Sequence, residues 1–152
     1  MTKQIYYHGT KEENKKKIIE SRKLKQTYKE YEQSEDGFVY ICDEKDFAQT
    51  ISYATDPLTM LFTFVKIEII VDSELYKNLH YEEKKSCIGT LKSYKYNGEI
   101  DFNDEGINSA KIVTLDKINP KYIDFVNIIT EESPNYDEAK KIIDGLKWEQ
   151  IK

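Results

Sequence analysis

His8, Gly9 and Thr10 follow one another near the start of the chain and carry groups that can contact a small ligand. The imidazole can donate or accept a hydrogen bond near neutral pH, and the hydroxyl can do both. Gly9 has no Cβ, so a ligand can come close to its main chain. A lone histidine at a strand end more often has only a structural role. The triplet therefore indicates a site only if other stretches support it.

A second stretch, residues 37–54, contributes two aromatic side chains, Tyr40 and Tyr53. Their ring faces could serve as a platform for a ligand. Tyr40 is expected on a short strand that ends at Asp43, which can cap a following helix. Tyr53 is expected beside the apolar stripe of that helix, where it could reach a neighbouring cleft. Either tyrosine taken alone is better explained as a core residue.

The alternation of Ile5 and Tyr7 with Tyr6 and His8 predicts a strand with one face inward. Gly9 is expected to turn the chain at its end. Thr10 is followed three positions later by Glu13, the form of a capping box, which predicts a helix starting at Thr10. His8, Gly9 and Thr10 would then lie at a strand-to-helix corner.

The rest of the chain contains more strand signals than helix signals. Residues 61–70 form a nearly continuous apolar run, which predicts a central strand. Further strands are expected at 91–96, 111–115 and 122–129, a short helix at 72–79, and loops at 28–36, 81–85 and 101–108. The segment 134–152 is expected to form an amphipathic helix at about 135–150. We therefore expect one α+β domain spanning residues 1–152.

The net charge, the cysteines and histidines, and the apolar runs of the chain argue against several classes of function. The net charge of -5 argues against non-specific binding to nucleic acid. The two cysteines and two histidines have no metal-ligand spacing, so no metal is expected. No apolar run is long enough to span a membrane, and no apolar signal region follows the first residues, so neither membrane association nor export is expected and the location should be cytoplasmic.

Three ordered blocks resemble the ADP-ribosyltransferase fold, in the branch that includes diphtheria toxin and the poly-ADP-ribose polymerases. Residues 7–10 (YHGT) are similar to the family's His-Gly-Ser/Thr corner, and Leu24-Lys25 to its Leu-Arg pair after the first helix. Residues 37–54 resemble its Gly-x-Tyr strand and the helix ending in a nicotinamide-stacking Tyr. Residues 118–123 are a weaker match to the start of its last strand. The resemblance implies a split β-sheet core with short flanking helices.

The resemblance also implies a role for each matching residue. His8 would hydrogen-bond a ribose hydroxyl of NAD, supported by Thr10, and Gly9 would offer main-chain groups to the nicotinamide carboxamide. Tyr40 and Tyr53 would sandwich the nicotinamide ring. Lys25 would approach the pyrophosphate as a point charge. His8 and Tyr53 would thereby take part in catalysis, with NAD as the substrate.

The family's catalytic glutamate has no clear counterpart, because residues 108–111 (NSAK), where it is expected, contain no acid. Cleaving the nicotinamide bond develops positive charge on the ribose, which a carboxylate stabilises. Glu105, slightly upstream, is our candidate, and Glu99 is the alternative.

Three hypotheses follow. The first is an enzyme that transfers ADP-ribose from NAD to a macromolecule such as a protein, or hydrolyses NAD. The second is an inactive module of the same fold that binds NAD, ADP-ribose or a related nucleotide as a sensor or decoy. The third is a protein-interaction domain with a vestigial pocket. An acid near the nicotinamide ribose would separate the first from the second, and a filled cleft would favour the third.

Overall fold

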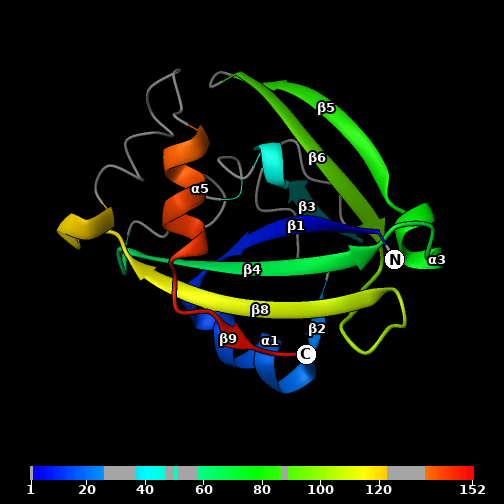
Figure 1. Cartoon of the computed structure of the whole chain (residues 1–152), viewed down its shortest axis with the longest axis horizontal. Helices are drawn as coiled ribbons and strands as arrows, with labels where there is room; N and C mark the ends of the chain where they lie inside the picture. Colours follow the sequence, from blue (N-terminus) through cyan, green and yellow to red (C-terminus); the bar gives the residue numbers. More distant parts are fainter. Residues whose placement is uncertain (1, 26–36, 47–49, 51–57, 87–88, 123–135) are drawn as a thin grey trace.

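The computed structural model of the chain describes residues 2–25, 37–46, 50, 58–86, 89–122 and 136–152. These residues form a seven-stranded antiparallel sheet, in the order β5-β6-β3-β1-β4-β8-β9, and a two-stranded sheet, β2-β7 (Figure 1). The expected α+β class is confirmed, with strands dominating the described residues.

The strands are β1 (Lys3–Thr10), β2 (Lys23–Leu24), β3 (Phe38–Asp43), β4 (Leu61–Ile70), β5 (His80–Ser86), β6 (Gly89–Asn97), β7 (Ile100–Asp101), β8 (Ile107–Asp116) and β9 (Glu149–Gln150). The helical segments are the 3-10 turns η1 (Glu12–Asn14) and η2 (Glu44–Asp46) and the helices α1 (Lys15–Ser21), α3 (Glu74–Lys77) and α5 (Tyr136–Asp144).

The large sheet is a middle layer with a hydrophobic cluster on each face. On one face, Val65 of β4 packs with Ile18 of α1 and Leu24 of β2. On the other, Phe64 of β4 packs with Ile143 of α5. Because β4 alternates between two buried faces, its sequence is apolar almost throughout, which confirms the central strand predicted at 61–70.

Two expectations for the second half of the chain are wrong. Residues 81–85, expected to be a loop, belong to β5, which is paired along its length with β6. Charged side chains are compatible with a strand at a sheet edge, where water reaches them. The last helix ends at Asp144 instead of continuing to about 150. Gly145 follows, and the chain then forms the edge strand β9.

Other local predictions are confirmed. The Asp43 carboxylate accepts hydrogen bonds from the main-chain N–H groups of Lys45 and Asp46, at 3.0 and 3.2 Å, and so caps η2. A short helix, α3, lies within 72–79, and β6 and β8 cover the strands expected at 91–96 and 111–115. The loop at 28–36 and residues 123–129 of the expected strand at 122–129 lie outside the described residues. Tyr122, where that strand was expected to begin, is helical instead, and its N–H is donated to the carbonyl of Asn119. Across the described part of the chain, no helix combines the length and apolar character of a membrane span.

Candidate functional site

His8 lies near the end of β1, partly buried, and its Nδ1 atom is 2.7 Å from the main-chain oxygen of Tyr40 on β3. A carbonyl oxygen only accepts, so Nδ1 must carry the proton in this contact. Burial lowers the pKa of His8, against a smaller upward effect of the Tyr40 hydrogen bond, which favours the neutral ring. The lone pair is then on Nε2. His8 therefore offers a ligand a hydrogen-bond acceptor.

A cavity of about 580 Å³ opens beside His8, between the end of β1 and the segment from α1 through β2. Its size is within the range of small-molecule sites. Eight of its ten lining residues have polar or charged side chains, and the buried Ile18 and Leu24 are the two apolar ones. The lining residues are His8, Thr10, Asn14, Lys17, Ile18, Glu20, Ser21, Lys23, Leu24 and Lys25.

Thr10 lines this cavity but does not cap the first helix. β1 runs straight through Gly9, which pairs with Phe64 of β4, to Thr10, so the predicted turn at Gly9 is wrong. The cap position of η1 is Lys11, and neither it nor Asn14 before α1 makes a side-chain cap. Instead the Asn14 Nδ2 group donates to Thr10 Oγ1 at 2.9 Å. The Thr10 hydroxyl proton is thus left to donate to a ligand.

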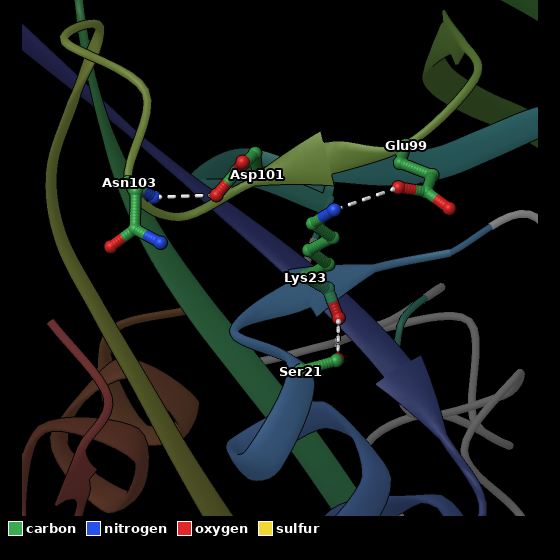
Figure 2. Close-up of polar contacts among 5 residues, drawn as sticks. All are labelled: Ser21, Lys23, Glu99, Asp101 and Asn103. Carbon is green, nitrogen blue, oxygen red and sulfur yellow. Dashed lines mark hydrogen bonds and ion pairs between the residues drawn. The ribbon is translucent and has the colours of Figure 1, made fainter.

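The opposite wall is fixed by the end of α1. Arg22 ends the helix in the left-handed conformation, with φ of 56°, and turns the chain into β2. Its carbonyl accepts the N–H of Phe102 at 2.9 Å, and β2 pairs with β7. Figure 2 shows the Lys23 side chain directed at Glu99 from across this small sheet, with Nζ and Oε2 3.4 Å apart. The two-residue pairing therefore sets where Lys23 and Lys25 lie over the cavity.

The charge of the cavity is positive although the whole chain is acidic. Three lysines, Lys17, Lys23 and Lys25, line it, against one carboxylate, Glu20. Within the described residues Lys17 and Lys25 have no ion-pair partner, and both are exposed. Together with the acceptor on His8 and the Thr10 hydroxyl, they suit a ligand that combines anionic groups with hydroxyl groups.

Comparison of the chain with protein-family models, with curated proteins and with solved structures finds no match. Arguments about function therefore depend on the cavity.

The structure does not place Tyr40 in this cavity. Tyr7 lies opposite Cys42 in the β1-β3 ladder, so their side chains share a face of the sheet. Tyr40, two residues before Cys42, points to that same face, whereas His8, next to Tyr7, points to the other. Tyr40 instead contributes its carbonyl oxygen, which fixes the His8 ring. Tyr53, the other expected ring partner, lies outside the described residues.

Glu105 and His8 lie at opposite ends of the sheet. Val65 of β4 is the partner of His8, whereas Ile70, at the far end of β4, donates its N–H to the carbonyl of Gly106. That length of strand corresponds to about 17 Å. The exposed Glu105 is thus not brought together with His8. Glu99, the alternative, is not among the lining residues either, but it makes an ion pair with Lys23, which lines the cavity.

Sequence reasoning missed the contribution of α1. Asn14, Lys17 and Ser21 line the cavity together with Ile18, and their spacing of three and four residues places them on one face of the helix. That periodicity was available in the sequence. The sequence did not show which way this face of the helix points, because that depends on the pairing of β2 with β7.

Cysteine chemistry finds little support in the described residues. Burial raises the pKa of the Cys42 thiol to about 12, so its thiolate is scarce at neutral pH. The described part of the chain also contains no group of three or more metal-ligating side chains.

Proposed function

We propose that this chain binds NAD, ADP-ribose or a related nucleotide in the cavity beside His8, on a sheet that is a variant of the ADP-ribosyltransferase fold. One observation carries the proposal: a neutral histidine acceptor, a threonine hydroxyl and three lysines line the same cavity. A ribose hydroxyl would donate to His8 Nε2. A pyrophosphate would lie near Lys17 and Lys25, whose ammonium groups act as point charges.

Isothermal titration calorimetry with NAD, ADP-ribose and pyrophosphate tests the proposal. Lys17→Gln should weaken binding of each by about two- to fivefold, the effect of one exposed charge contact, and the effect should shrink in high salt. Lys3→Gln is the matched control, because Lys3 is an exposed lysine at the other end of β1 from His8 and does not line this cavity. The absence of binding heat for all three ligands with folded protein would refute the proposal, and equal losses in both variants would place the ligand elsewhere.

Turnover of the bound nucleotide is a second candidate function, in which the chain transfers ADP-ribose to a protein or hydrolyses NAD. Glu20 favours it, because its carboxylate lines the same cavity as His8 and could stabilise positive charge on a ribose. Glu99 is the next candidate, because it makes an ion pair with Lys23, which lines the cavity.

Nicotinamide release, followed by mass spectrometry, separates binding from turnover. The parent is compared with Glu20→Gln, Glu99→Gln and Glu105→Gln. If the chain is an enzyme, release should fall by about 10²- to 10³-fold in the variant that lacks the catalytic acid and remain near the parent level in the others. Binding by the parent without release, with or without a protein acceptor, would support the binding module.

A further inference from the structure

β5 is an edge strand with an unpaired side. It ends the seven-stranded sheet and pairs with β6 alone among the described strands. Figure 1 shows it as the outermost strand on the side away from α5. An edge of this length presents a row of main-chain N–H and C=O groups that another strand can pair with. The opposite edge, β9, has only two residues.

The charges along β5 are ordered as Glu82-Glu83-Lys84-Lys85. Alternation places Glu82 and Lys84 on one face of the strand and Glu83 and Lys85 on the other. Glu82 is neutralised within its own chain by Lys95, at 2.6 Å, and by Lys84, at 3.6 Å.

Glu83 and Lys85 are not neutralised in this way. Glu83 accepts the Tyr81 hydroxyl at 2.7 Å, and within the described chain no lysine lies within ion-pair distance of it, including Lys92, its cross-strand partner on β6. Lys85 is exposed and likewise lacks an ion-pair partner among the described residues. One face of the edge therefore carries an acid and a base, two residues apart, each available to an opposite charge.

We propose that β5 pairs antiparallel with β5 of a second copy of this chain, about a two-fold axis at Lys84, which joins the two sheets into one. Antiparallel pairing about an axis through the sheet keeps each residue on its own face, so an axis at Lys84 sets Glu83 opposite Lys85 of the partner, twice. The two Lys84 residues meet at the axis, but each is already held by its own Glu82.

Neighbouring registers are less favourable. An axis at Glu83 sets the two Glu83 carboxylates against each other and leaves Lys85 opposite Tyr81. It also sets Glu82 opposite Lys84 of the partner, but Glu82 is already neutralised within its own chain. An axis at Glu82 sets two glutamates together and Glu83 opposite Tyr81. Like charges directly opposite one another destabilise a strand pair. The distribution of charge thus favours the register centred on Lys84.

Sedimentation of the full chain over a range of concentrations tests this pairing. The parent should show a monomer-dimer equilibrium. Glu83→Lys and Lys85→Glu should each raise the dimer Kd by about tenfold, because two opposite-charge pairs become like-charge pairs. Lys16→Glu, an equal charge change on exposed α1, should leave the Kd unchanged. Circular dichroism checks that each variant is folded.

Mixing the two variants gives the decisive result. A Glu83→Lys copy facing a Lys85→Glu copy again has opposite charges at both positions, so the mixture should form a heterodimer with about the parent Kd. The double variant should also restore dimerisation. A monomeric parent at all concentrations would overturn the proposal and indicate that the charges keep the edge unpaired. A parent dimer that is insensitive to the single changes, or a mixture that stays monomeric, would also overturn it.

Discussion

Two substitutions at His8 can separate its hydrogen bond to Tyr40 from its proposed hydrogen bond to a ligand. Its Nδ1 proton is donated to the Tyr40 carbonyl, and its Nε2 lone pair is the acceptor offered to a ligand. Asparagine can place an amide N–H near the position of Nδ1 but has nothing at the position of Nε2. His8→Asn should therefore keep the internal hydrogen bond and lose the ligand contact, whereas His8→Ala loses both.

The expected sizes follow from these contacts. Removing the partner of the part-buried Tyr40 oxygen should lower the free energy of unfolding by about 1 to 3 kcal/mol in His8→Ala, or roughly 2 to 12 °C in melting temperature. His8→Asn should melt within about 2 °C of the parent. Both variants should weaken ADP-ribose binding by roughly 2- to 13-fold, which is the net worth of one hydrogen bond.

Thermal melting without ligand measures the internal hydrogen bond, and calorimetry with ADP-ribose measures the proposed ligand contact. The tautomer assignment would be wrong if His8→Asn melted as low as His8→Ala. The ligand contact would be wrong if His8→Asn bound ADP-ribose as tightly as the parent. Calorimetry should be run at a temperature where all three proteins are folded.

Three further predictions concern stability. Because burial lowers the pKa of His8, this residue takes up a proton in the unfolded chain at a higher pH than in the folded one. The free energy of unfolding should therefore fall as the pH drops from about 6.5 towards the lower folded-state pKa, by at most about 1.4 kcal/mol per pH unit. Urea unfolding at several pH values should show this loss in the parent and less of it in His8→Asn. Leu24→Ala should lower the free energy of unfolding by about 2 to 5 kcal/mol, because Leu24 is 1% exposed, and urea unfolding that matched the parent would show that Leu24 is not packed as described. Gly98→Ala should cost about 1 to 2 kcal/mol from backbone strain alone, since φ is 97° and an added Cβ would contact nothing, and an unchanged melting temperature would contradict that conformation.

The parts of the fold that the sequence predicted are those where burial alone dictates the pattern. β4 is buried on both faces, so its nearly continuous run of apolar residues correctly predicted a central strand. Asp43 caps the next turn through its own carboxylate, a contact made within three residues. The strand carrying His8 was also predicted, but with one face inward, whereas Tyr6 and Tyr7 are both buried, in the clusters on opposite faces of the sheet.

The sequence was less informative where the outcome depended on distant partners. β5 carries charges on both faces, and only its pairing with β6 makes it a strand. Thr10 has the spacing of a capping box, but the continuation of β1 places its hydroxyl beside Asn14 instead. Tyr40 and Glu105 looked compatible with a site at His8. Only the register of the sheet shows that the Tyr40 side chain is on the opposite face from His8 and that Glu105 is at the far end of the sheet. A local sequence pattern does not show which residues of two strands pair with each other.

The pairing of β2 with β7 has a consequence for how the cavity comes into being. The hydrogen bond from Phe102 to Arg22 joins segments about 80 residues apart, and the cost of closing so long a loop has to be met before the contact forms. Ile100 and Phe102, both 0% exposed, can pack in place only once the central strands exist. A partly folded chain that retained β1 and α1 would therefore have His8 and the lysines without the wall that brings them together. Binding of the proposed nucleotide would report on completion of the whole fold, and protection of the Phe102 amide from hydrogen exchange would rise with occupancy.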